Sequence, residues 1–166
     1  SKTLAPGLRL GFMAASPQLI PYLTRLKQAA DLHSNRLSQW LVFQHLQHPE
    51  KAHRMNTLVS HYRQKRDQFA ECLKQYFSDI AAWETPKGGL FFWLTLNAHI
   101  DTRTLLPVAI EQGVAFMPGE QFYPDSHDGI GTMRLNFSHA SEEDMRCGLE
   151  ILSRFIKNSS QYSSNA

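Results

Sequence analysis

Two basic residues with the spacing of a reactive site lie at the start of the chain. Lys2 and Arg9 are seven positions apart, and Pro6 and Gly7 make a turn between them. A lysine that is desolvated or lies near other cations can lose its proton near neutral pH and act as a nucleophile. Arg9 can neutralise a phosphate, and Gly7 lets an anion approach the backbone closely. The segment fits an amine nucleophile beside a phosphate site, but a surface lysine and a structural arginine flanking a loop have the same spacing.

A third basic residue, Arg134, lies in a segment where apolar and polar residues alternate. Met133 and Leu135 fall on one face of the strand expected over residues 132–138, and Arg134 and Asn136 fall on the other. An arginine in the centre of such a strand is costly unless it meets an anion, and a guanidinium binds a carboxylate through two hydrogen bonds. The segment therefore indicates a carboxylate site, or else an arginine on the solvent face that pairs with a glutamate.

The hydrophobic periodicity predicts the elements that must position these residues. Helices are expected to start at Ser16, to resume after a break at residues 31–35, to run over residues 50–77 and 101–112, and to follow a Ser141 cap. Strands are expected over residues 8–15, 90–96, 114–117 and 132–138. This order predicts an α+β fold, in which a small mixed sheet of three or four strands packs against helices. Residues 158–166 are rich in serine and asparagine, and we expect a disordered tail there.

The composition is ordinary for one globular domain. The chain has 166 residues, of which 42% are hydrophobic and 19% are charged, and its formal net charge is +2. The densest basic cluster, Arg63, Lys65 and Arg66, is typical of a solvated helix face rather than of a nucleic-acid patch. No apolar run approaches the ~20 residues that a membrane span requires. We therefore expect no membrane association and no nucleic-acid contact from this segment.

The cysteines and histidines give no sign of a metal or a disulfide. Cys72 and Cys147 fall on expected helices without a CxxC spacing, and we expect free thiols in the reducing environment of the cytoplasm. His45, His48 and His53 lie close in sequence, but no HExxH pattern accompanies them. Surface or capping histidines are the expected reading, and we predict no metal site.

The segment from Ser1 to Gly11 resembles the cofactor-lysine segment of fold-type I pyridoxal-phosphate (PLP) enzymes, the class I/II aminotransferases. In that family the lysine forms a Schiff base with the cofactor aldehyde, and the arginine after Pro-Gly binds the cofactor phosphate. The resemblance implies that Lys2 is the catalytic lysine and that Lys2, Arg9 and Ser1 contact pyridoxal 5'-phosphate.

Other segments resemble the same family in the same order along the chain. Residues 134–138 match the late strand whose arginine holds the substrate α-carboxylate, which makes Arg134 the implied substrate-binding residue. Residues 87–93 resemble the Gly-Gly-x-Phe strand of the small domain, and residues 113–122 resemble the strand and Pro-Gly loop near the substrate entrance. Residues 27–34 resemble a segment of the 2-aminoadipate and multisubstrate aminotransferase branch.

The resemblance also implies a division of the chain. Residues 1–15 would be a remnant of the large cofactor-binding domain, and residues 16–157 would hold the connecting helices and the C-terminal small domain. In the family, residues that contact the cofactor ring precede the lysine. We therefore expect a C-terminal portion of a larger protein, inactive by itself and homodimeric when full length.

Two functions remain open. The first is a PLP-dependent aminotransferase, which moves an amino group between an amino acid and a 2-oxo acid. The second is the effector-sensing domain of a GntR/MocR-type transcriptional regulator, whose DNA-binding domain would lie outside this chain. Both would keep Lys2, Arg9 and Arg134, so the residues before Ser1 would distinguish them.

Overall fold

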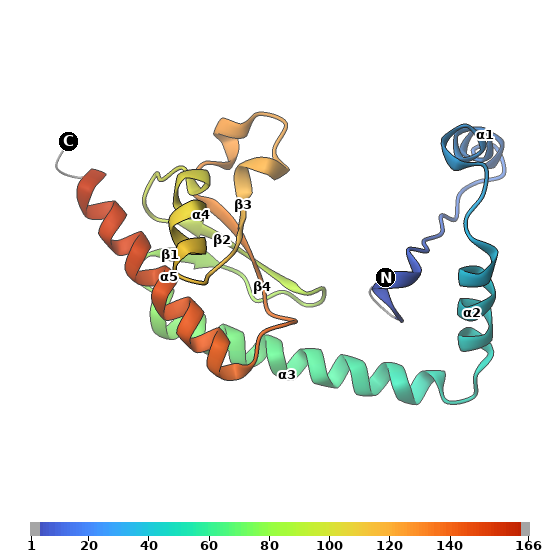
Figure 1. Cartoon of the computed structure of the whole chain (residues 1–166), viewed down its shortest axis with the longest axis horizontal. Helices are drawn as coiled ribbons and strands as arrows, with labels where there is room; N and C mark the ends of the chain where they lie inside the picture. The colour runs from blue at the N-terminus through green and yellow to red at the C-terminus, as the bar shows by residue number, and fades with distance from the viewer. Residues whose placement is uncertain (1–3, 164–166) are drawn as a thin grey trace. The chain divides into compact units, whose positions relative to one another are not determined.

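The computed structural model describes residues 4–163, with side chains up to residue 159 (Figure 1). It divides into two compact units, one up to Val59 and one from Ser60, which we call the first and second units. The boundary falls inside the long helix α3 (Lys51–Phe77), which confirms the helix expected over residues 50–77. We describe each unit by itself.

The first unit holds two helices and an irregular N-terminal segment. α1 (Ile20–Asp31) starts later than expected, and α2 (Arg36–Gln47) follows the predicted break at residues 31–35. Asn35 caps α2, because its side-chain oxygen accepts a hydrogen bond from the Ser38 backbone N–H at 3.0 Å. The break between the helices is therefore fixed by local capping chemistry.

The strand expected over residues 8–15 is absent from the described structure, and that prediction was wrong. A short 3-10 helix, η1 (Pro6–Leu8), comes first, and residues 9–16 have no regular secondary structure. A strand satisfies its backbone N–H and C=O groups only by pairing with a neighbouring strand. The described part of the first unit contains no other strand, so an apolar sequence alone does not make one here.

The second unit is built on a four-stranded sheet with the order β1-β2-β4-β3. The strands are β1 (Ala81–Trp83), β2 (Phe91–Leu96), β3 (Met117–Pro118) and β4 (Thr132–Asn136). Each pairing is antiparallel, where we expected a mixed sheet. The strands at 90–96 and 132–138 are confirmed, whereas β1 was not expected, since three residues are too short to show an alternating pattern.

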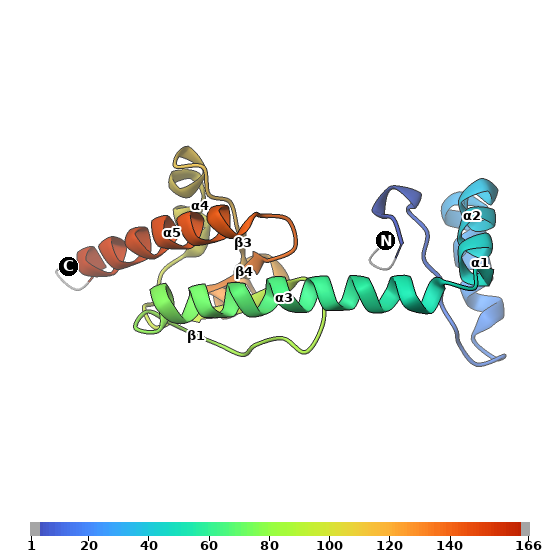
Figure 2. The same cartoon turned by 90° about the horizontal axis from the view of Figure 1, so that it is seen from below.

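One face of the sheet carries the hydrophobic core. Phe92 and Leu94 of β2 lie opposite Leu135 and Met133 of β4, and all four are buried. Helices α3 and α5 (Glu142–Ser163) cover this face (Figures 1 and 2). Each large apolar side chain buried there contributes about 1.5–3 kcal/mol. The fold class predicted from the sequence, a small sheet packed with helices, is confirmed.

The two helices that flank β3 and β4 begin with side-chain caps. Asp101 caps α4 (Thr102–Glu111) by accepting a hydrogen bond from the Arg103 backbone N–H at 3.0 Å. Ser141 caps α5, since its hydroxyl accepts from the Asp144 N–H at 3.1 Å and donates to the Asp144 carboxylate at 2.7 Å. The backbone of α5 is helical to Ser163, beyond residue 158, where a disordered tail was expected.

The basic cluster on α3 corrects one expectation from the sequence. Arg63 is exposed, but Lys65 and Arg66 are half-buried and act as structural donors. The Lys65 ammonium donates to the backbone carbonyl of Ala140 at 2.8 Å, and the Arg66 guanidinium donates to that of Pro86 at 3.3 Å. The cluster is therefore only in part a solvated face, because it ties α3 to two loops of the second unit.

The cysteines of the described residues form no disulfide. Cys72 and Cys147 are free thiols, as expected, with Cys72 half-buried and Cys147 exposed. Burial raises the pKa of the Cys72 thiol, and the Glu142 carboxylate adds to the effect.

Among residues 4–163, no group of His, Cys, Asp or Glu side chains is arranged to hold a metal ion. No helix in that range combines the length and apolar character that crossing a membrane requires.

Candidate functional site

Arg134 lies at the centre of β4, on the face of the sheet that faces away from the core. Its Cα is paired with Trp93 of β2 on one side and with Met117 of β3 on the other. Its neighbours in sequence, Met133 and Leu135, point into the core and are buried. The alternation read from the sequence thus placed Arg134 on the correct face, and the residue is half-buried there.

Two aromatic rings contact the guanidinium group of Arg134. Its central carbon, Cζ, lies 4.1 Å from the centre of the Phe91 ring and 4.7 Å from the centre of the Phe122 ring. Both distances are within the range of a cation–π interaction, which contributes about 0.5–1 kcal/mol at an exposed site and ~2 kcal/mol when desolvated. Phe91 comes from β2, whereas Phe122 comes from the 3-10 helix η2 (Gly119–Phe122). Together they hold the charged group in place over the sheet.

The hydrogen-bonding capacity of Arg134 is not used within the described residues. Its Nε atom is buried and has no hydrogen-bond partner there. No ion pair in the described part of the chain includes Arg134, so the glutamate pairing that the sequence left open is absent from it. A buried charged donor without a partner costs several kcal/mol. The guanidinium thus has no hydrogen-bond or ion-pair partner among the described residues.

The surroundings of Arg134 are aromatic. Trp93 meets Phe122 edge to face, with 5.5 Å between ring centres, and its ring centre lies 6.2 Å from that of Tyr123. Phe122 and Tyr123 are exposed, so aromatic surface is open to solvent beside the guanidinium. The sequence indicated Arg134 but not the ring of Phe122 above it. No local pattern could have found that contact, because η2 and β4 meet only in the folded chain.

Arg9, the second predicted basic residue, follows η1 in the first unit. It is exposed, and its backbone has the left-handed conformation (φ 48°) that arginine rarely adopts. Its N–H donates to the Pro6 carbonyl at 3.2 Å, which closes the turn predicted at Pro6-Gly7. Its side chain has no hydrogen bond or ion pair within the described residues, whereas Ser1 and Lys2 lie outside those residues. Arg9 and Arg134 belong to different units.

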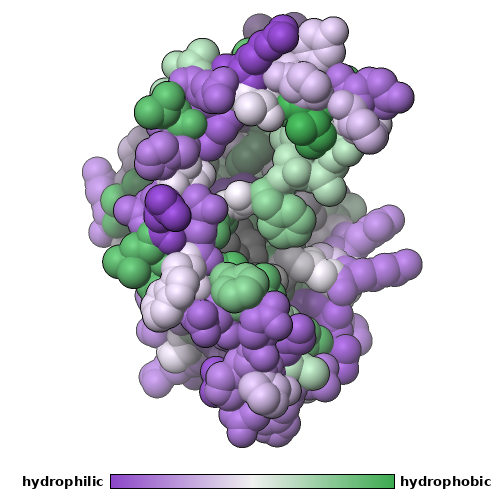
Figure 3. Space-filling view, turned by 90° about the vertical axis from the view of Figure 1, so that its right-hand side faces the viewer, coloured by the Kyte–Doolittle hydropathy of each residue, from purple (hydrophilic) through white to green (hydrophobic). Residues whose placement is uncertain are grey.

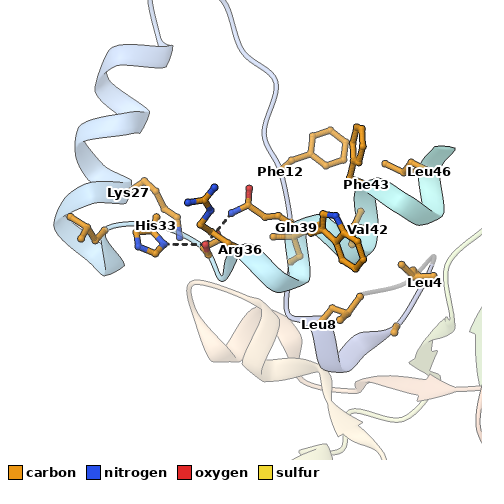
Figure 4. A pocket seen from close by; sticks show the side chains of 16 residues that line it. Leu4, Leu8, Phe12, Lys27, His33, Arg36, Gln39, Val42, Phe43 and Leu46 are labelled. Carbon is orange, nitrogen blue, oxygen red and sulfur yellow. Dashed lines mark hydrogen bonds between the residues drawn. The ribbon is translucent and has the colours of Figure 1, made fainter.

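A largely apolar cavity of about 1120 Å³ lies within the first unit. Its lining side chains come from the N-terminal segment and from the region of α1 and α2 (Figure 4), with Leu4, Leu8, Phe12, Phe43 and Leu46 among them. Figure 3 gives a space-filling view and shows hydrophobic side chains at the surface among hydrophilic ones. Arg9 does not line the cavity, although Leu8 and Leu10 on either side of it do.

Comparison with known proteins places these residues in a family. The family model "Aminotransferase class I and II" matches residues 1–152. The chain is 38% identical over 157 residues to aromatic-amino-acid aminotransferase 1 of Thermococcus litoralis, and the match covers 95% of this chain and 37% of that protein. It is also 31% identical to the HTH-type transcriptional regulator NorG of Staphylococcus aureus, over 95% of this chain and 35% of the regulator.

Solved structures give the same result for the fold. The multiple substrate aminotransferase of Thermococcus profundus superposes with a TM-score of 0.88 at 34% identity, covering 96% of this chain and 40% of that one. The α-aminoadipate aminotransferase LysN of Thermus thermophilus, solved with N-(5'-phosphopyridoxyl)-L-leucine, gives 0.85 at 32% identity, over 95% of this chain and 40% of that one. The chain spans about two fifths of the length of the relatives it matches. It belongs to the aminotransferase class I and II family.

Proposed function

We propose that this chain is the C-terminal portion of a PLP-dependent aminotransferase domain, which moves an amino group between an amino acid and a 2-oxo acid. The observation that carries the proposal is Arg134, with its buried, unpartnered Nε and two aromatic rings on its guanidinium. A carboxylate fits this site because it accepts two parallel hydrogen bonds from a guanidinium edge. The α-carboxylate is the group that every amino acid and 2-oxo acid substrate shares.

The cofactor would be held from the N-terminal segment. The exposed Arg9 side chain, which has no partner within the described residues, suits a phosphate. Lys2 would be the catalytic lysine, and Ser1 a further contact. Pyridoxal phosphate, when bound, supplies an electrophilic carbon and an electron sink. LysN, a relative, was solved with a phosphopyridoxyl-leucine adduct, which supports the same ligand class here.

Each residue would then have a separate task. Arg134 would bind the substrate carboxylate and so orient the Cα–H bond. Lys2 would take the proton from Cα as a general base and return a proton as a general acid. Arg9 would neutralise the phosphate and keep positive potential near the Lys2 amine, which favours its neutral, reactive form.

The remaining structure of the full-length protein is also a proposal. Residues 1–15 would belong to a large cofactor-binding domain, and the apolar cavity of the first unit would be covered by that domain. Active sites in a homodimer would be completed by residues from outside this chain. The share of its relatives that the chain covers, about two fifths, supports the assignment of a further domain.

A second function is supported by a specific observation. The similarity to NorG, described as an HTH-type transcriptional regulator, covers 95% of this chain at 31% identity. In such a protein the same site would bind an amino acid effector, and DNA binding would come from another domain. A basic helix-turn-helix segment upstream of Ser1 would decide for the regulator.

The test uses the longer polypeptide that contains this chain, loaded with pyridoxal phosphate. Lys2→Ala should abolish amino-group transfer from any donor. Arg134→Lys keeps the charge but loses the two-pronged geometry, and it should lower kcat/KM about tenfold or more, since charge-assisted hydrogen bonds contribute about 1.5–3 kcal/mol. Arg103→Lys, at an exposed ion pair with Asp101, is the matched control and should leave kcat/KM unchanged.

The isolated chain offers an independent measurement. It is mixed with pyridoxal phosphate, reduced with borohydride and analysed by mass spectrometry for a covalent label on Lys2. Weak labelling is expected, because cofactor positioning needs many preorganised contacts.

Undiminished amino-group transfer by the Lys2→Ala variant of the longer polypeptide would refute the catalytic assignment.

A further inference from the structure

A buried carboxylate lies directly behind the aromatic loop that contacts Arg134. Glu120 is the second residue of η2 and is only 2% exposed. It accepts a hydrogen bond from the Thr102 backbone N–H at 2.8 Å and one from the Thr102 hydroxyl at 2.7 Å. That hydroxyl also lies 2.9 Å from the Thr132 carbonyl oxygen, at the start of β4. Because the hydroxyl has a single hydrogen to donate, Glu120 ties η2 to the first turn of α4, and Thr102 lies between Glu120 and β4.

The cost of burying Glu120 indicates a role beyond capping α4. A carboxylate taken out of water costs several kcal/mol unless hydrogen bonds and a favourable field compensate. The first turn of α4 supplies such a field, because the Thr102 backbone N–H points at the carboxylate. Yet Asp101 already caps that helix through the Arg103 N–H. What Glu120 adds is a connection between α4 and η2, the segment that carries Phe122.

The loop around Glu120 is packed so closely that it has little freedom to shift. A Cβ atom on Gly119 would lie 1.8 Å from the Thr132 hydroxyl oxygen. A Cβ atom on Gly129 would lie 2.5 Å from the Cα of Glu120. Both distances are shorter than any real contact, so only glycine fits at either position. Glu120 is thus confined by backbone on the side of Gly129 and held by its hydrogen bonds to Thr102, while Gly119 beside it packs against Thr132.

Phe122 follows Glu120 by two residues, so the contacts that hold Glu120 also restrain the position of Phe122. Its ring lies 4.7 Å from Cζ of Arg134 and 5.5 Å from the ring centre of Trp93. Phe122 is 46% exposed, so packing alone restrains it weakly. A shift of η2 would move this ring away from the guanidinium and leave Arg134 free to change rotamer.

We propose that Glu120 is a positioning residue for Arg134: by tying η2 to Thr102 at the start of α4, it keeps Phe122 against the guanidinium and so keeps the guanidinium directed at the incoming carboxylate. The inference rests on the proposed carboxylate role of Arg134. It adds that the affinity for the carboxylate depends on a residue that never touches it. A side chain that is already held in its bound conformation loses less conformational entropy when the ligand binds, so the affinity is higher.

The experiment uses the 166-residue chain and the fluorescence of Trp93. Trp40→Phe and Trp83→Phe leave Trp93 as the single tryptophan, whose ring touches Phe122. The probe is 3-phenylpropionate, titrated at constant ionic strength. The parent should show a saturable change, Arg134→Ala should show none, and Glu120→Ala should raise Kd about tenfold.

Two further variants separate positioning from stability. Glu120→Gln can still accept from the Thr102 N–H and can donate to the Thr102 hydroxyl, so it should bind within about twofold of the parent. Leu149→Ala empties part of the core on α5, remote in sequence from η2, and serves as the destabilised control, with unchanged Kd expected. Thr102→Val removes only the hydroxyl and carries the test if Glu120→Ala does not fold. Circular dichroism at the titration temperature verifies that each variant is folded.

Each result of the titrations either supports or overturns the positioning role of Glu120. A folded Glu120→Ala or Thr102→Val variant that binds like the parent overturns the positioning role. Equal weakening in Leu149→Ala overturns it as well, because stability alone would then explain the loss. If Arg134→Ala binds like the parent, the carboxylate site itself is refuted, and the proposed function fails before the question about Glu120 arises. Rescue by Glu120→Gln beside loss in Glu120→Ala supports the inference.

Discussion

The guanidinium carbon of Arg134 lies 4.1 Å from the centre of the Phe91 ring, although the two residues are 43 positions apart in sequence. They come together because β2 and β4 are adjacent antiparallel strands in which Phe91 is paired with Asn136, two residues beyond Arg134. Diagonal neighbours on one face of such a pair are within reach of long side chains. The sheet register therefore produces the contact.

Replacing Phe91 should weaken the carboxylate site without unfolding the protein. Phe91→Leu keeps an apolar side chain on the strand but removes the aromatic face, which contributes about 0.5–1 kcal/mol to holding a cation. We expect KM for the amino acid to rise about two- to fivefold in the longer polypeptide, with kcat nearly unchanged. Phe155→Leu, on α5, is the matched control. An unaltered KM in Phe91→Leu would mean that the ring does not orient Arg134.

Adding one methyl group at Gly119 should be severely destabilising. The new Cβ would lie 1.8 Å from the Thr132 hydroxyl oxygen, so η2 or β4 must move. Overpacking of this kind costs about 1–3 kcal/mol or more. Urea denaturation of Gly119→Ala should show that loss, whereas Gly88→Ala should change stability little, because nothing lies within 4 Å of its added Cβ. Comparable midpoints for the two variants would contradict the close approach.

The charge of Asp101 should make part of the stability depend on pH. Hydrogen bonds from the Arg103 side chain lower the pKa of the Asp101 carboxyl from 3.8 to about 2. A carboxyl with a lowered pKa in the folded state stabilises the protein fully above its unfolded pKa, and this contribution is lost progressively as pH falls from about 4 through 2.

The variant Asp101→Asn keeps a capping side chain but removes the charge. Urea denaturation at pH 6 should show the parent as the more stable protein, and the difference should shrink as the pH falls from about 4 through 2. Other carboxyl groups titrate in both proteins, so only the difference between them is compared. A difference that stays constant over this range would assign the effect to something other than this ionisation.

The core behind the sheet should be sensitive to a single cavity. Leu94 is fully buried on β2, opposite Met133. Leu94→Ala should lower the free energy of unfolding by about 2–5 kcal/mol. Val108→Ala removes apolar atoms from an exposed position of α4 and should cost under ~0.5 kcal/mol, as is usual for surface positions. Thermal denaturation followed by circular dichroism measures both, and a similar loss in the two variants would contradict the assigned core.

Local sequence patterns determined most of the second unit. The three- and four-residue periodicity over 51–77, the alternation over 132–136 and the Ser141 cap each specify their element through nearby residues, and each is present in the structure. The same alternation identified Arg134 as a candidate site residue, since burying a charged side chain in a strand costs free energy unless an anion pairs with it. The roles of Ser1, Lys2, Arg9 and Arg134 in binding cofactor and substrate remain predictions.

Only the tertiary structure decided the rest, because those features depend on partners that are distant in sequence. The apolar residues 8–15 form no strand, since the described first unit offers them no strand to pair with, while β1 forms from two alanines and a tryptophan because β2 lies beside it. The burial of Glu120 and the contact of Phe122 with Arg134 likewise follow from where η2, α4 and β4 meet. Periodicity fixes which face a side chain occupies, whereas packing fixes what that side chain touches.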